Sequence, residues 1–204
     1  MKTQKYILGL ACLLMIQGYA WSQQGVLKAN INYGVGIPVG SFKTVTNEVS
    51  PRGWNASVLY GVTDNLSLGL GTGYQDFYQR YPRQITYTSG SDLSAVVTNS
   101  VQVTPILLTG KYRLSATGKI EPFAALGVGA NFINYRKFYG EFADNRSTVG
   151  FAAQPELGVY IPFTSAKRTG LNLSAGYNIM PFKYNDVTNL NHLAIKGGIS
   201  FTLR

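Results

Sequence analysis

The sequence predicts an all-β protein: a closed, antiparallel, up-and-down transmembrane β-barrel of about eight strands. Three observations predict this fold. Apolar side chains alternate with polar or very small ones in one stretch after another, and short connections alternate with long ones. In addition, only 13% of the 204 residues are charged, whereas 13% are aromatic and 23 are glycine. Strands that face lipid on one side and a polar interior on the other have this combination of features.

Residues 1–22 are predicted to be an export signal. Lys2 and Lys5 precede an uninterrupted apolar run at residues 6–16, which is the layout of a cleaved signal peptide. The run is too short for a spanning helix, which needs ~20 residues. The remaining residues, 23–204, are few enough to form a single barrel domain.

We place signal cleavage after Ser22, with cleavage after Ala20 as the alternative. A lipoprotein signal that uses Cys12 is the rival interpretation, but an apolar run follows this cysteine. Because Cys12 is the only cysteine of the chain, its removal leaves a mature protein without disulfides.

The formal net charge of +9 falls to +7 when the two lysines of the signal leave. Nucleic-acid-binding domains concentrate such an excess on one patch or stripe, whereas the basic residues of this chain are scattered singly or in pairs. We interpret the charge first as a solvated excess with no specific partner. Contact with anionic lipid or polysaccharide is the alternative, and we expect no nucleic-acid partner.

The first predicted strand, residues 27–37, shows the alternation clearly. Ile31 and Tyr33 alternate with Asn30 and Asn32, and successive side chains of a strand point to opposite faces. One face is therefore apolar and the other polar. The same period of two recurs at residues 54–62, 66–75, 101–114, 121–132, 151–163, 171–179 and 193–204.

The stretch 101–114 is less regular than the others. Val101 and Leu107 share a side with Lys111, so the pattern does not settle which face is the apolar one. Pro105 lies inside the stretch and has no N–H to donate to a ladder. The last stretch, 193–204, alternates well and needs a partner for its free edge, so we expect it to close the barrel against the first strand.

The connections between these stretches are of two kinds, as in outer-membrane barrels with an even number of strands. A soluble, lipocalin-like barrel is the alternative fold and has its apolar residues inside, which the alternation alone does not distinguish. The long connections and aromatic residues near strand ends favour the membrane barrel. The short turns are residues 63–65, 115–119 and 164–169, and the long loops are residues 38–51, 76–100, 135–148 and 180–191.

Several motifs resemble those of the small outer-membrane β-barrel proteins of Gram-negative bacteria, the porin-superfamily "outer membrane protein beta-barrel" type with an OmpA-like strand count. They are the signal, G-V-G-I-P-V-G-S-F at residues 34–42, Y-G-V-T-D-N-L-S-L-G-L-G-T-G-Y at residues 60–74, and the terminal strand. The resemblance covers essentially the whole mature chain. It implies the cell outer membrane as location, short periplasmic turns, long extracellular loops, contact with outer-membrane lipid, and assembly by the barrel assembly machinery.

Four charged residues fall on the polar faces of the strands: Lys28, Glu121, Glu156 and Lys196. An eight-stranded barrel has an interior just wide enough for side chains, and isolated buried charges are costly. We therefore expect these residues to form ion pairs in a filled lumen. A proton or ion path through the lumen is the alternative.

No catalytic, cofactor or metal site is predicted. The glycine-rich stretches at residues 69–73 and 127–129 lie in predicted strands with no following helix, so they lack the context of a phosphate-binding loop. His192 is the only histidine, which together with the loss of Cys12 excludes a His/Cys metal cluster. No serine motif flanks His192, so we predict that the protein is not an enzyme.

The sequence thus predicts a non-enzymatic role in envelope integrity, adhesion, or binding of a surface ligand or envelope protein through the loops. A lipid-modifying enzyme similar to lipid A deacylases, and a small channel, are the alternatives. The predicted inward direction of Phe123 and Tyr160 opposes a channel. The loop 76–100 is the first candidate binding site, because tyrosine and arginine are enriched at binding hot spots; its candidate residues are Tyr78, Arg80, Tyr81, Arg83 and Tyr87. The alternative is a variable loop whose tyrosines line the membrane rim.

Overall fold

The computed structural model describes residues 25–82, 84–88, 91–115, 119–139, 142–164, 168–184 and 187–203, with the backbone alone at 84–88, 91–95, 139 and 142. The predicted signal, residues 1–22, lies outside the described residues. Among the described residues, no helix is long and apolar enough to cross a membrane.

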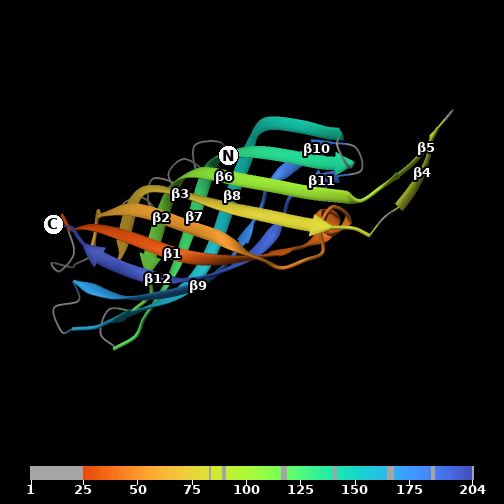
Figure 1. Ribbon diagram of the computed structural model, residues 1–204. Coiled ribbons are helices and arrows are strands. Elements are labelled where there is room, and N and C mark those ends of the chain that lie inside the picture. The colour runs from red at the N-terminus through yellow and green to blue at the C-terminus, as the bar shows by residue number, and fades with distance from the viewer. Residues whose placement is uncertain are drawn as a thin grey trace, which may run out of the picture.

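Eight antiparallel strands form a closed barrel, which confirms the predicted fold class (Figure 1). Neighbours around the barrel follow the order β1-β12-β9-β8-β7-β6-β3-β2, so each strand pairs with its sequence neighbours in the barrel and the last closes on the first. The barrel strands are β1 (Leu27–Pro38), β2 (Ser50–Gly61), β3 (Leu66–Arg80), β6 (Val97–Arg113), β7 (Glu121–Tyr139), β8 (Phe142–Pro162), β9 (Thr169–Asn178) and β12 (His192–Thr202).

The predicted closure between the first and last strands is confirmed, for example by the pairing of Val35 with Ile195. Following paired residues once around the barrel from Phe151 leads back to Ile161 on the same strand β8, which is a shear of ten residues. Such a stagger requires the strands to tilt against the barrel axis.

Three smaller elements lie at one end of the barrel, which we call the loop end. They are the 3-10 helix η1 (Gly40–Thr44), the hairpin of β4 (Gln84–Thr88) and β5 (Ser91–Ala95), and the hairpin of β10 (Pro181–Tyr184) and β11 (Val187–Asn189). Figure 1 shows β4 and β5 extending away from the barrel at this end. The opposite end carries the short connections and the C-terminal end of the chain, and we call it the turn end.

The outer face of the barrel is apolar, which excludes the lipocalin-like alternative. Leu70 and Leu108 point outward and are 63% and 64% exposed, whereas Asn30 and Lys196 point inward and are 4% and 5% exposed. On β7 the outward side chains are apolar from Pro122 to Phe132. Ten residue steps at ~3.4 Å, tilted by ~40°, correspond to a height of roughly 26 Å, which matches the ~25 Å lipid-facing band of outer-membrane barrels.

Strand β6 explains the ambiguous stretch of the sequence. Val101, Leu107 and Lys111 all point inward, with Val101 and Leu107 buried. In the β3–β6 ladder, Thr72 pairs with Ile106, and the next pair is Gln75 with Val103. The ladder is interrupted between these two pairs, at Pro105, which has no N–H to donate. The Thr72 hydroxyl donates instead to the Pro105 carbonyl, at 3.0 Å.

Two of the predicted long loops, residues 76–100 and 135–148, are strand for most of their length, so these loop predictions were wrong. β3 continues to Arg80, and β7 and β8 remain paired up to Tyr139 and Phe142. Ladder hydrogen bonds are made by the backbone and continue beyond the apolar band. The alternation of apolar and polar side chains ends there because the outward face of these extensions lies beyond the apolar band.

Candidate functional site

The half of the lumen nearer the turn end is filled by charged and amide side chains. Lys196 Nζ lies 2.6 Å from Glu156 Oε2, and Arg113 Nη1 lies 3.3 Å from Glu121 Oε2. We call this region the polar layer; its charged members are Lys28, Lys111, Arg113, Glu121, Glu156 and Lys196.

The four predicted lumen residues all lie in the polar layer, and Lys196 pairs with Glu156. Glu121 pairs with Arg113, whose guanidinium also donates to the Asp64 carbonyl at the turn end. Lys28 lies with its Nζ 5.4 Å from the centre of the Tyr160 ring.

Lys111 crosses the same layer. Its Nζ lies 3.6 Å from the centre of the Phe123 ring and donates to Asn172 Oδ1 at 3.4 Å. Phe123 and Tyr160, both predicted to point inward, are 2% and 5% exposed. Two cavities of about 40 and 60 Å³ border this layer, and a third of about 20 Å³ lies beside Gln75 and His192.

The half of the lumen nearer the loop end is apolar, whereas the sequence predicted a polar interior throughout. Side chains from η1 and from the β10–β11 region fold into the barrel and pack on inward residues of the strands. We call this cluster the apolar plug; its main members are Phe42, Phe182, Val187 and Leu190 from the connections, and Phe77, Val101 and Ile133 from the strands. The rings of Phe42 and Phe77 pack edge to face, with centroids 4.8 Å apart.

His192 lies beneath the apolar plug. It is 3% exposed, its ring centroid is 4.9 Å from that of Phe77, and its Nδ1 is 3.0 Å from the Leu190 carbonyl oxygen. Among the described residues, no group of three or more His, Cys, Asp or Glu side chains is arranged to hold a metal ion.

The predicted binding residues of the stretch 76–100 do not form one cluster. Tyr78 and Arg80 point outward from β3 and are exposed. Tyr81 instead anchors a connection, because its hydroxyl donates to the Val45 carbonyl at 3.1 Å. Burial raises the pKa of the Tyr81 hydroxyl above its ordinary value; the Glu48 carboxylate raises this pKa further, and Lys137 acts in the opposite direction.

The other two predicted binding residues are not placed in full. Arg83 lies outside the described residues. Tyr87 lies on β4, where its backbone pairs with Asp92.

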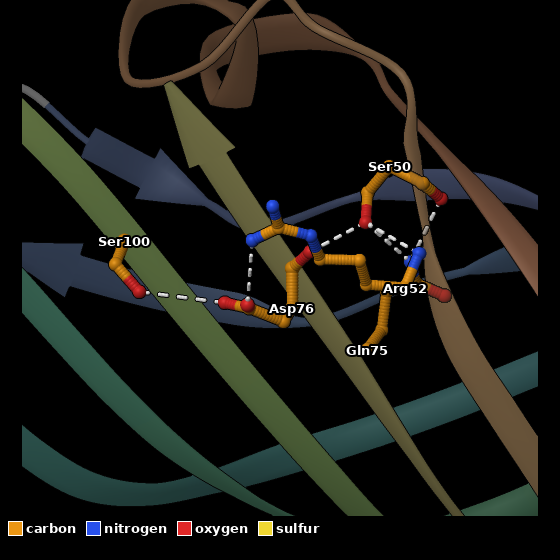
Figure 2. Close-up of polar contacts among 5 residues, drawn as sticks. All are labelled: Ser50, Arg52, Gln75, Asp76 and Ser100. Carbon is orange, nitrogen blue, oxygen red and sulfur yellow. Dashed lines mark hydrogen bonds and ion pairs between the residues drawn. The ribbon is translucent and has the colours of Figure 1, made fainter. Parts of the chain in front are cut away.

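A polar cluster at the loop-end rim joins β2, β3 and β6 (Figure 2). Arg52 Nη1 lies 3.5 Å from Asp76 Oδ2, and the Ser100 hydroxyl donates to Asp76 Oδ1 at 3.3 Å. Gln75 points inward and its Nε2 donates to the Ser50 hydroxyl at 2.8 Å, while that hydroxyl donates to the Asp76 carbonyl. The cluster holds the first residues of β2 against β3, and it fixes the Asp76 carboxylate on the outer face.

The sequence interpretation missed Arg52, Asp76 and Ser100. Trp54 on β2 and Tyr74 on β3 are paired, and both point outward. Arg52, two residues before Trp54, and Asp76, two residues after Tyr74, are the next outward residues toward the loop end. Continuing the alternation of these two strands past the aromatic residues would have placed both charges on the outer face.

No protein-family model and no curated protein sequence matches the chain. Among solved structures, the chain is similar to neisserial surface protein A, with a TM-score of 0.50 and 12% identity over 86% of this chain and 95% of that chain. It is also similar to the outer membrane protein OprG from Pseudomonas aeruginosa, with a TM-score of 0.57 and 10% identity over 89% of this chain and 97% of that chain. The chain therefore has the fold of the small eight-stranded outer-membrane β-barrels.

Proposed function

We propose that the protein is a non-enzymatic outer-membrane barrel, exported through a cleaved signal, that binds a ligand or partner at the cell surface through its loop end. The apolar outer band supports the membrane location, and in this arrangement the loop end is extracellular. One observation carries the proposal: the polar layer and the apolar plug fill the lumen, whereas the strands on one side of the barrel continue past the apolar band.

The filled lumen favours a role at the surface over a role in conduction. A cavity needs roughly 10–15 Å³ of accessible volume to hold one water molecule. The cavities of about 40 and 60 Å³ therefore have room for a few water molecules each. Both cavities border the polar layer, and the apolar plug lies between them and the loop end.

The strand extensions provide a rigid surface for binding. Residues 134–139 of β7 pair with residues 142–147 of β8, and residues 97–102 of β6 pair with β7 on the other side. We call these segments the projecting wall. Paired strands position side chains more firmly than a loop does, and a site on rigid elements loses less conformational entropy on binding.

Shortening the projecting wall tests this proposal. Tyr135 and Arg146 are paired, so residues 136–145 can be replaced by Asn-Gly, which closes a two-residue hairpin. The removed segment contains Arg136, Lys137, Glu141 and Asp144, so the net charge does not change.

We expect the shortened protein to keep its barrel, seen as different gel mobility with and without boiling, and to lose binding to arrays of surface polysaccharides and peptides that the full protein binds. A variant with Lys119→Gln and Arg168→Gln at the turn end is the control and should bind as the full protein does. Equal binding by the full and shortened proteins, or stable large currents from the full protein in planar bilayers, would contradict the proposal.

A further inference from the structure

We infer that the outer face of β2, β3 and β7, just beyond the apolar band, binds the phosphate groups of a membrane lipid headgroup. The site consists of Arg52, Arg80 and Arg136, which we call the arginine patch. The inference rests on the membrane location proposed above and names a ligand for one part of the loop end.

The strand register places these arginines on one continuous surface. Tyr78 pairs with Ser100, and Ser100 pairs with Arg136, so Tyr78 and Arg136 stand two strands apart in one row. Arg80 lies two residues beyond Tyr78 on the same face of β3. With strands ~4.8 Å apart and ~3.4 Å per residue, the Cα atoms of Arg80 and Arg136 are roughly 12 Å apart. Two arginine side chains can span that separation and reach one phosphorylated headgroup.

The charges of the surface favour an anionic ligand. The patch has three arginines and Asp76 as the neighbouring carboxylate, which is engaged by Arg52 and by the Ser100 hydroxyl (Figure 2). Arg52 also lies with its guanidinium carbon 5.4 Å from the centre of the Tyr78 ring. Arg80 and Arg136 are both exposed, and the described residues provide no ion-pair partner for either.

The patch is confined to one side of the barrel. On the other strands, the outward residues at and beyond the edge of the apolar band are uncharged: Ile37 on β1, Ser100 and Thr98 on β6, Ser147 and Asn145 on β8, Ile179 after β9 and Leu193 on β12. A general excess of positive charge around the rim would not have this distribution. Arginine forms paired hydrogen bonds with phosphate oxygens through its planar guanidinium, and its apolar stem can lie along the band while the charged group reaches the headgroups.

A lipid titration tests the inference. The full mature barrel in zwitterionic phosphatidylcholine nanodiscs is titrated with lipid A that carries two phosphates, and the bound lipid is counted by native mass spectrometry. The test variant is Arg80→Gln with Arg136→Gln. The control variant is Arg146→Gln with Lys183→Gln, which removes the same charge from exposed loop-end residues outside the patch.

We expect the test variant to bind the phosphorylated lipid about 25-fold more weakly, at ~1 kcal/mol or about fivefold per arginine, and the control variant to change by less than about threefold. Neither variant should change binding of the dephosphorylated glycolipid, and inorganic phosphate at the same phosphate concentration should not displace the lipid. Equal losses in both variants, equal binding of both lipids, or displacement by free phosphate would overturn the inference.

Gel mobility and membrane fractionation of the same variants report on the proposed function separately. A test variant that fractionates with membranes and keeps normal gel mobility while losing the lipid supports the patch. A protein that does not insert into membranes refutes the proposed function, whatever the titration gives.

Discussion

The ion pair between Lys196 and Glu156 provides a sharp test of how the lumen is held together. Their side chains are 4% and 14% exposed, and Nζ and Oε2 are 2.6 Å apart. Replacing Glu156 with Leu leaves Lys196 in a polar layer whose other charged members are Lys28, Lys111, Arg113 and Glu121. Removing one partner of a buried pair costs about 3–5 kcal/mol, because the remaining charge stays buried without compensation.

The lower end of that range applies here. The cavity of about 60 Å³ borders both Glu156 and Lys196, so water can solvate part of the remaining charge. We therefore expect a loss near ~3 kcal/mol in the free energy of unfolding. At a slope of ~2.5 kcal/mol per molar urea, the unfolding midpoint falls by about 1 M.

Urea unfolding of the barrel in lipid vesicles, followed by tryptophan fluorescence and by gel mobility, measures this change. The double variant with Glu156→Leu and Lys196→Met is the matched control, because an apolar pair of similar volume is often as stable as a buried ion pair. It should recover most of the loss. An unchanged midpoint for Glu156→Leu, or a double variant no more stable than the single one, would refute the reasoning that Lys196 depends on Glu156.

Three further predictions concern other parts of the molecule. Phe42→Ala removes the ring that packs on Phe77, so the free energy of unfolding should fall by about 3–5 kcal/mol and conductance in planar bilayers should rise; unchanged conductance and midpoint would show that the apolar plug does not depend on Phe42. Deleting residues 84–95 removes β4 and β5, which form a sheet of their own, so gel mobility with and without boiling should stay as in the full protein; loss of the folded band would contradict this. Gly69→Ala places a Cβ in collision with the Val58 carbonyl oxygen, whereas the Cβ of Gly110→Ala lies 3.4 Å from its nearest neighbour, Leu68. Only Gly69→Ala should lower the urea midpoint, with a loss of more than about 1 kcal/mol in the free energy of unfolding, and equal midpoints for the two variants would argue against close approach of β2 and β3.

The eight barrel strands were predictable because each crosses the apolar band with one face outward. Ile31 and Leu70 carry the alternation that a lipid-facing surface requires, and the closing pair of strands followed from the need to remove free edges. The sequence contained no comparable pattern for the extensions of β7 and β8. Asn134 and Ser147 are paired there as regularly as residues in the band, but polar and apolar side chains no longer separate by face.

The apolar plug was not predictable because its members come from connections that are distant in sequence. Phe42 and Leu190 lie in stretches that contain turn-forming and charged residues, and their burial depends on how η1 and the β10–β11 region fold into the barrel. Inward Val101 and Leu107 on β6 were the available indication. They share a face with Lys111 because this face crosses from the apolar plug into the polar layer.

Tryptophan fluorescence gives the most direct test that the outer face of the barrel contacts lipid. The chain has two tryptophans, Trp21 beside the predicted cleavage site and Trp54 on β2. The measurement uses residues 23–204, which contain Trp54 alone. The Trp54 side chain points outward and the residue is 48% exposed. In vesicles of lipids brominated on their acyl chains, its emission should be strongly quenched, whereas iodide in the water should have little effect. Efficient quenching by iodide without quenching by the brominated lipid would contradict a membrane-spanning barrel.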